Sequence, residues 1–343
     1  MVRNVYWVGL LLAGLAGLTA QAQADNVPGS TRLSGTLYTD WTYLNQQQNG
    51  ANTGASGYGI DVKRFYLGVD HSFDDSWSAN LTTDFNYVKS DAETRLFVKK
   101  AFVQARLDQA ATFRLGSADM PWIPFDESIY GYRFVENTLI DRLHFGNSAD
   151  WGIHFLGSNG WSKYAVSLVN GGGYKNPTRT RSMDWEGRLA VYPVSGLVIA
   201  LGAYSGDLGQ NTATTPALNT ANRQDALIAY KTERATLGAE YFHASNFTPA
   251  AITSNATDSA SGYSLFGSVR IADNGTALFA RYDNANPSKD LDPSKKDKYY
   301  NAGISFPANK NITWAVAYKY EDLADNTPGL KNREIGVWAQ IKF

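Results

Sequence analysis

The sequence contains no cysteine among its 343 residues, which excludes disulfide frameworks, iron–sulfur clusters and thiol nucleophiles. It also lacks an excess of charge of either sign, because 31 Lys and Arg stand against 32 Asp and Glu. A basic surface that would bind nucleic acid is therefore not expected. None of the four histidines has a second histidine at the spacing of a zinc site. We predict no nucleic-acid partner, no metal and no cofactor.

The motifs of common enzymes are lacking as well. The sequence has no G-x-S-x-G element of a serine hydrolase. The three glycines at 171–173 lack the Lys-Ser/Thr partner of a phosphate-binding loop, and the charged stretch Asp283–Lys298 lacks the calcium-loop pattern. We predict that the protein is not an enzyme.

Long apolar runs are missing after residue 25, so no segment there has the ~20 apolar residues of a membrane-spanning helix. Before it, Arg3, the apolar stretch Val5–Leu18 and the small-residue site Ala22–Ala24 form the pattern of a secretory signal peptide. A membrane-anchoring helix is the alternative, for which this stretch is short. We predict a signal peptide at residues 1–24 and one domain at residues 25–343. Cleavage leaves 343 − 24 = 319 residues, with 30 Lys and Arg against 32 Asp and Glu.

Aromatic residues and glycine are abundant, with 20 Tyr, 16 Phe, 9 Trp and 31 Gly, a composition that favours short, twisted strands. Alternation of apolar and polar residues with a period of two predicts sixteen of them. They are Thr31–Leu44, Tyr58–Phe73, Ser76–Lys89, Thr94–Asp108, Ala111–Ala118, Ala149–Gly157, Trp161–Asn170, Ser182–Tyr192, Gly196–Gly206, Arg223–Thr232, Ala235–Asn246, Ser261–Ala272, Gly275–Asn284, Asp297–Phe306, Asn311–Glu321 and Lys331–Phe343.

The links between these strands alternate between tight turns and longer polar loops. Outer-membrane barrels have this layout, with short periplasmic turns and longer extracellular loops, and an even strand number puts both chain ends on the periplasmic side. A soluble sandwich or barrel also has alternating strands. Sixteen strands, however, close a barrel too wide for side chains to fill, so the polar face must line water and the apolar face must contact lipid. We predict an all-β fold, a sixteen-stranded antiparallel transmembrane β-barrel.

The chain ends on an apolar alternation, in which Val337, Ala339, Ile341 and Phe343 share one face of the last strand. In a barrel this face contacts lipid, and the last strand closes against the first, which leaves no free edge. Alternating apolar residues before a terminal Phe resemble the sorting signal of bacterial outer-membrane proteins that the barrel assembly machinery reads. The resemblance implies a Gram-negative outer membrane, with its lipid and lipopolysaccharide as neighbours.

One link breaks the pattern, because Asp119–Ser148 spans 30 residues and carries six aromatic rings. A loop this long and aromatic is usually functional and buries its rings. We expect it to fold into the barrel lumen and narrow the channel, with two prolines stiffening its entry. An outward flap against a neighbouring protomer is the alternative. The residues predicted for this constriction loop are Pro121, Pro124, Phe125, Asp126, Glu127, Arg133, Glu136 and Arg142.

The central third of the chain resembles the phosphate-selective porin family, and the likeness is weaker elsewhere. The runs FRLGSADMPWIPFDES, FVENTLIDRL and ADWGIHFLG are similar to that family's strand, its loop with a Pro-Phe-x-Glu element, a downstream Glu and the following strand. The matching positions are Leu115, Gly116, Pro124, Phe125, Glu127, Glu136 and Gly152. The resemblance implies a sixteen-stranded channel that forms a homotrimer.

The alternation of each strand also selects the charged residues on the water side. The predicted pore-lining cations are Arg64, Lys100, Arg106, Arg114, Arg188, Arg270, Arg281, Lys319 and Lys342. Asp84, Glu186, Glu240 and Glu334 share this face, and for such acidic residues we favour transverse salt bridges. The lining is thus mixed with a basic lean.

Cations in a low-dielectric channel raise the local concentration of anions. Asp126, Glu127 and Glu136 of the long loop would oppose this effect. We predict passive diffusion of small hydrophilic solutes with a preference for anions, among which the family resemblance suggests phosphate. The alternatives are an outer-membrane barrel hydrolase and a structural or adhesive barrel without conductance.

Overall fold

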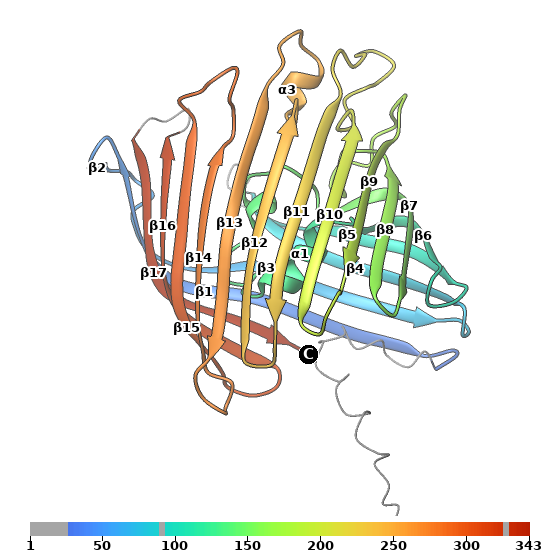
Figure 1. Cartoon of the computed structure of the whole chain (residues 1–343), viewed down its shortest axis with the longest axis horizontal. Coiled ribbons are helices and arrows are strands. Elements are labelled where there is room, and N and C mark those ends of the chain that lie inside the picture. The colour runs from blue at the N-terminus through green and yellow to red at the C-terminus, as the bar shows by residue number, and fades with distance from the viewer. Residues whose placement is uncertain (1–26, 89–92, 325–328) are drawn as a thin grey trace, which may run out of the picture.

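The computed structural model describes residues 27–88, 93–324 and 329–343. Within these ranges one antiparallel sheet contains sixteen long strands and a two-residue strand, β2 (Ala51–Asn52), in the first loop. Each long strand pairs with the next, and β17 pairs with β1, so the sheet closes into a barrel (Figure 1). The long strands are β1 (Thr31–Gln48), β3 (Gly57–Ser72), β4 (Trp77–Val88), β5 (Glu93–Arg106), β6 (Thr112–Asp119), β7 (Ala149–Asn159), β8 (Ser162–Val169), β9 (Asp184–Val191), β10 (Leu197–Gly206), β11 (Ala221–Lys231), β12 (Ala235–Ser245), β13 (Ser259–Arg270), β14 (Ala277–Asn286), β15 (Lys296–Pro307), β16 (Ile312–Ala324) and β17 (Leu330–Lys342).

All sixteen predicted strands are confirmed, and with them the predicted all-β fold of a closed sixteen-stranded antiparallel barrel. The largest difference is at the end of β1, which continues to Gln48 instead of stopping at Leu44. The predicted signal peptide, residues 1–24, lies outside the described residues, as do most of the predicted link at 90–93 and part of the link at 322–330.

The links divide the barrel into two rims. Residues 49–56, 170–183, 207–220, 246–258 and 287–295 form loops at one end, the long-loop rim, and the turns at 73–76, 107–111, 160–161, 192–196, 232–234, 271–276 and 308–311 form the short-turn rim (Figure 1). Both described chain ends lie at the short-turn rim, where the Gly29 N–H donates to the Ser72 carbonyl at 2.8 Å. An even number of strands requires this placement.

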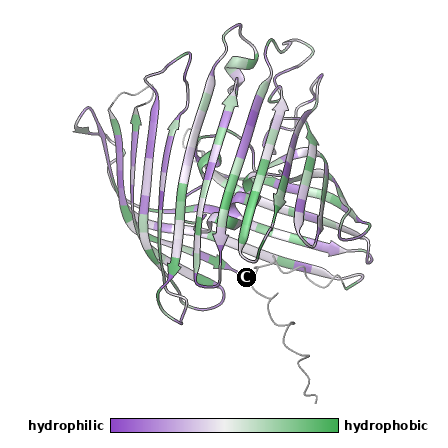
Figure 2. Ribbon diagram, viewed as in Figure 1, coloured by the Kyte–Doolittle hydropathy of each residue, from purple (hydrophilic) through white to green (hydrophobic). Residues whose placement is uncertain are grey.

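Alternate residues of each strand lie on opposite faces of the barrel. On β12, Leu237 is 71% exposed on the outer face, whereas Glu240 and Phe242 are 1% and 0% exposed on the inner face. Large apolar side chains are exposed on strand after strand, and Figure 2 shows hydrophobic residues along the strands and mostly hydrophilic long loops. The barrel therefore carries apolar groups outside and charged groups inside, the reverse of a soluble domain.

The seam between β1 and β17 contains thirteen residue pairs. Its ladder ends at Phe343, whose carbonyl accepts from the Gly35 N–H at 2.8 Å and whose N–H donates to the Gly35 carbonyl at 3.1 Å. A Cβ atom at Gly35 would lie 2.1 Å from the Phe343 ring, so this ring rests directly on the glycine. Val337, Ala339 and Ile341 share the outer face with Phe343. The terminal residue is thus an integral part of the seam.

In the part of the chain that the structure describes, three short helices accompany the strands: α1 (Ile123–Tyr130), α2 (Leu139–Arg142) and α3 (Pro249–Ile252). Across residues 27–88, 93–324 and 329–343, none is long and apolar enough to cross a membrane. Helix α3 lies at the long-loop rim, whereas α1 lies inside the barrel, behind β11 and β12 in Figure 1. The segment that carries α1 and α2 positions the candidate site.

Candidate functional site

The link between β6 and β7, residues 120–148, folds into the barrel lumen, and we call it the inner loop. Its first helix, α1, has Pro124 in the first turn, where the missing N–H has no helical partner in any case. The helix ends at Gly131, whose φ of 67° suits glycine. The length of the segment and its aromatic rings predicted that it folds inward. The alternative, an outward flap, is not what the structure shows. The two helices within it were not predicted.

Trp122 fastens the start of the inner loop to the opposite wall. Its backbone N–H donates to Glu186 of β9 at 2.9 Å, and its indole N–H donates to Glu240 of β12 at 3.3 Å. The ring lies on Gly202 of β10, where a Cβ atom would be 2.4 Å away. Since Trp122 is fully buried, replacing that glycine would displace the indole.

An Arg-x-Asp pattern on two wall strands holds the middle and the end of the inner loop. On β11, Arg223 donates from Nε to Asp225 at 2.9 Å, and on β14, Arg281 donates from Nε to Asp283 at 2.8 Å. Residues two apart share one face of a strand, so each aspartate orients its own arginine. Each guanidinium then donates from Nη1 to a carbonyl oxygen of the inner loop. The accepting carbonyls belong to Phe145 and Asn137.

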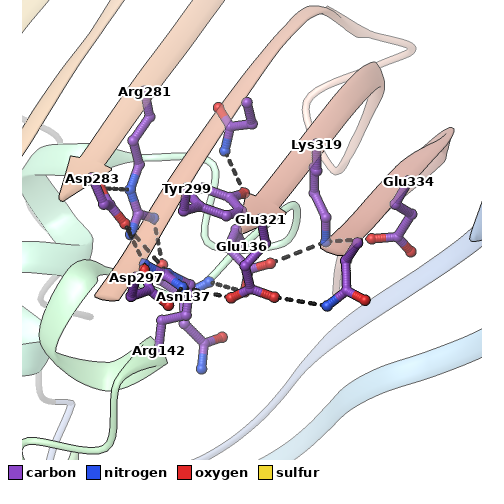
Figure 3. Close-up of polar contacts among 12 residues, drawn as sticks. Glu136, Asn137, Arg142, Arg281, Asp283, Asp297, Tyr299, Lys319, Glu321 and Glu334 are labelled. Carbon is purple, nitrogen blue, oxygen red and sulfur yellow. Dashed lines mark hydrogen bonds and ion pairs between the residues drawn. The ribbon is translucent and has the colours of Figure 1, made fainter. Parts of the chain in front are cut away.

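Arg142 of α2 forms the most highly charged contact between the inner loop and the wall (Figure 3). Its guanidinium lies 2.5 Å from Asp297, 2.6 Å from Glu321 and 3.2 Å from Asp283, on strands β15, β16 and β14. The Arg142 side chain is only 7% exposed. A guanidinium presents five donors in a fixed fork and can satisfy several carboxylates at once. Here one loop arginine joins three neighbouring strands.

A second ion-pair group lies beside it. Lys319 of β16 contacts Glu136 of the inner loop at 3.0 Å and Glu334 of β17 at 2.6 Å (Figure 3). Burial alone would raise the pKa of Glu136, but Lys319 outweighs it and lowers that pKa. Both salt bridges and ring packing hold the loop, because Tyr130 stacks on Phe266 with 3.7 Å between the centroids.

Three of the predicted pore-lining cations contact the inner loop. Arg281 and Lys319 are each 7% exposed beneath the inner loop and are neutralised by carboxylates. Arg188 of β9 lies 4.1 Å above the Phe125 ring and donates to the Pro121 carbonyl at 2.7 Å. All three lie on the inner face, as the alternation indicates, but alternation does not identify the part of that face that a loop contacts.

The inner loop therefore follows the wall from β9 to β17 and meets β1, where the rings of Phe134 and Tyr38 lie 6.4 Å apart. These contacts leave the inner face of β3–β8 as the part of the wall that would border an opening. Glu127 and Arg133 of the inner loop and Arg64 of β3 are close enough to interact electrostatically with the Tyr66 hydroxyl. Burial would lower the pKa of Arg133, but Glu127 and Asp141 raise it above its ordinary value. This loop cation is therefore charged at any physiological pH.

Cations follow the wall across the opening. Lys100 of β5 lies 3.2 Å from Asp119, and Arg114 of β6 donates to Gln104 at 2.9 Å. Arg64 is a looser partner of Asp84, at 3.9 Å. The strand pattern puts the other predicted cations, Arg106, Arg270 and Lys342, on the inner face near the short-turn rim.

Asp126, one of the residues predicted for the constriction loop, lies in α1 of the inner loop and faces the wall. It is fully buried between α1 and the wall, and neither carboxylate oxygen meets a donor among the described residues. Burial and then the neighbouring Glu240 raise the pKa of Asp126 well above its ordinary value, with Asp225 adding to the effect and Arg223 opposing it.

Two lining lysines were missed because each sits at a β-bulge. The register of β3 against β1 skips Lys63, and that of β5 against β4 skips Lys99, so each points inward beside its neighbour, Arg64 or Lys100. Strict alternation puts these lysines outside. The charges that hold the inner loop were also missed, although the repeated Arg-x-Asp pattern of β11 and β14 is visible in the sequence.

Metal binding finds no support in the described ranges, where no group of three or more His, Asp or Glu side chains could hold an ion. No protein-family model matches the sequence, and no curated protein matches it either. The predicted membership of the phosphate-selective porin family therefore stays a prediction.

Solved structures match almost the whole chain. The anion-selective porin from Comamonas acidovorans has a TM-score of 0.66 at 14% identity, and the match covers 92% of this chain and 100% of that one. The outer membrane channel DcaP of Acinetobacter baumannii has a TM-score of 0.64 at 12% identity, covering 96% and 100%. The trimer form of OmpT, an outer membrane protein of Vibrio cholerae, has 0.59 at 15% identity, covering 92% and 100%. The chain thus has the fold of outer-membrane porins.

Proposed function

We propose that the protein is an outer-membrane porin, a passive channel for small hydrophilic solutes that prefers anions such as phosphate. The observation that carries this proposal is the inner loop, which is fastened along one wall of the barrel by buried ion pairs, while Lys100 and Arg114 lie on another part of the wall. A loop held by buried ion pairs does not swing aside, so the opening has a fixed size. Solutes smaller than that opening diffuse down their gradients without an energy source.

The selectivity follows from charge at close range. Lys99, Lys100 and Arg114 project from β5 and β6, with Asp119 among them. Because the barrel wall is a low-dielectric medium, these cations raise the local concentration of anions more than they would in bulk water. The name of the Comamonas protein agrees with a preference of this kind. Phosphate is the expected solute on the ground of the sequence resemblance alone.

Location and assembly belong to the same proposal. The apolar outer face needs a lipid surrounding, and exposed rings at the short-turn rim, such as Phe73 and Trp77, suit a membrane interface. The predicted signal peptide exports the chain, and the barrel assembly machinery reads the strand that ends on Phe343. We propose a homotrimer surrounded by lipid and lipopolysaccharide, as the trimer form of the similar Vibrio protein suggests.

The hydrolase alternative would need a nucleophile beside a base. The Nδ1 atom of His154 does lie 2.8 Å from the Ser167 hydroxyl, but both residues are only 2% exposed, and Nε2 of the same ring faces the Gly116 carbonyl at 3.3 Å. A substrate cannot reach this pair, and both ring nitrogens are engaged by Ser167 and Gly116 rather than by an orienting carboxylate. The pair is a buried structural contact.

Planar-bilayer recording tests the proposal. The purified protein, which requires detergent, should insert in discrete conductance steps and should admit small sugars into liposomes up to a sharp size limit. Insertion without any current would support the structural or adhesive barrel instead. Ester or peptide hydrolysis by the same preparation, without current, would support the hydrolase.

A further inference from the structure

On the β3–β8 side of the barrel wall lies a group of rings and lysines, of which one member, Tyr66, also packs beside the inner loop. It consists of Tyr66 of β3, Phe97 and Lys99 of β5, and Tyr174 and Lys175 of the loop 170–183, and we call it the aromatic–cation cluster. The rings of Phe97 and Tyr174 are nearly parallel, at 26°, with centroids 5.8 Å apart. The ammonium of Lys175 lies 4.3 Å from the Phe97 centroid, and that of Lys99 lies 4.6 Å from the Tyr66 centroid.

The position of the cluster follows from the course of the strands. β6 pairs with β5 only from Ala101 to Arg106, because beyond Asp119 the chain turns into the inner loop. The part of β5 that contains Phe97 therefore continues toward the long-loop rim without a neighbour on that side. The loop 170–183 crosses this gap, held by the Trp151 indole, which donates to the Tyr174 carbonyl at 3.0 Å. The cluster thus lies on the long-loop side of the opening, where an entering solute passes first.

The charge of the cluster is positive. Arg64 and Lys99 are close enough to interact electrostatically with both Tyr174 and Lys175. Asp84 is the carboxylate that partly offsets these positive charges. The contacts that the structure gives to Lys175 are with rings, and those of Lys99 are with rings and the Tyr66 hydroxyl, 3.3 Å away. Desolvation and then repulsion by Arg64 lower the pKa of Lys175. A bound anion would counter both effects, because it would stabilise the charged ammonium. These ammonium groups can accept an anion without breaking a salt bridge to a carboxylate.

We propose that the aromatic–cation cluster is a binding site for aromatic carboxylates on their way into the channel; this rests on the proposed function. Cations alone would serve an inorganic anion, which cannot use the flat apolar rings. A solute with both a carboxylate and a ring uses both features, because its carboxylate meets the exposed Lys175 while its ring stacks on Phe97; Lys99, which is 8% exposed, adds positive charge from beneath. Lys175 is exposed, so its ammonium can leave the ring face and follow the carboxylate.

The test compares two carboxylates of similar size and equal charge, benzoate and cyclohexanecarboxylate, of which only benzoate has an aromatic face. Stepwise reduction of chloride current in bilayers gives the affinity of each. Benzoate should bind roughly threefold to tenfold more tightly, the advantage of an aromatic pair over simple area burial. Phe97→Leu keeps apolar bulk and should abolish the difference, whereas Lys175→Gln should weaken both ligands. Phe113→Leu, on the outer face of β6, is the matched control and should change neither affinity.

Chloride current with equal affinities for the two ligands would overturn this inference and leave the channel proposal intact. An unchanged benzoate preference in Phe97→Leu would also overturn it, because the rings would then only close the gap beside β6. Should no current appear at all, the channel proposal fails, and saturation-transfer NMR on the purified barrel in detergent still measures benzoate binding. Failure of benzoate to bind there, or binding equal to that of cyclohexanecarboxylate, would refute the site independently.

Discussion

Replacing Arg142 by glutamine should release the inner loop from the wall. The side chain is 7% exposed and contacts three carboxylates, at 2.5, 2.6 and 3.2 Å. Removing one partner of a buried ion pair costs about 3–5 kcal/mol, because the remaining charge is left buried and unpaired. Asp283 keeps Arg281 as a partner at 2.5 Å, so we expect the lower end of this range. A cost of about 3 kcal/mol shifts the equilibrium between docked and released loop by roughly 150-fold, at 1.4 kcal/mol per factor of ten.

The assay has two parts, single-channel conductance and the size limit for sugar entry into liposomes. A released loop widens the opening, so Arg142→Gln should conduct more, with larger fluctuations, and should admit larger sugars than the unchanged protein. Arg234→Gln is the matched control, because Arg234 is an exposed arginine in the turn between β11 and β12. It should leave both measurements unchanged.

One result would refute the reasoning. If Arg142→Gln assembles into a heat-modifiable barrel with unchanged conductance and size limit, the three-carboxylate contact does not hold the loop. Loss of the barrel itself would be a different outcome, and Arg142→Lys then serves as the milder variant. It keeps the charge but reaches fewer carboxylates, so it should give an intermediate conductance.

Three further changes test other parts of the account. Asp126→Asn should raise the stability in detergent by about 1–3 kcal/mol at pH 8 but not at pH 4. The reason is that the pKa of Asp126 is raised, so the stability that this residue gives is present at low pH and is lost as the pH rises through that pKa. An identical pH profile of stability in both proteins would contradict this. Gly35→Leu should reduce the yield of assembled barrel on unheated gels by displacing the Phe343 ring, whereas Gly54→Leu, in open space, should not; equal yields would show that the ring is dispensable to the seam. Arg114→Glu should shift the reversal potential toward cations, and the absence of any shift would mean that this side chain lies outside the ion path.

The sequence predicted the barrel well because strand patterning is a local signal. Each strand shows its two faces within a few residues, and the alternation of long loops and tight turns gives the order of the strands. The rings of the inner loop predicted its burial for a similar reason, since Trp122 and Phe145 need a dry site. These inferences need no knowledge of which strands lie opposite each other.

The lining was harder to predict because it depends on contacts across the lumen. Whether Lys319 faces water or Glu136 is decided by a distant loop, because the two residues of this contact are 183 positions apart in the sequence. Lys99 points inward only because of a bulge, which shifts the alternation by one residue. Both effects change the charge of the opening without changing the pattern of apolar residues.

The central claim is that the inner loop leaves a water-filled opening in which cations outweigh carboxylates. The most direct test is the reversal potential of the unchanged protein in planar bilayers that separate concentrated from dilute potassium chloride. We predict the sign that corresponds to a larger permeability of chloride than of potassium, with a magnitude that falls as ionic strength screens the lining charges. A potential of the opposite sign would contradict the account of the opening.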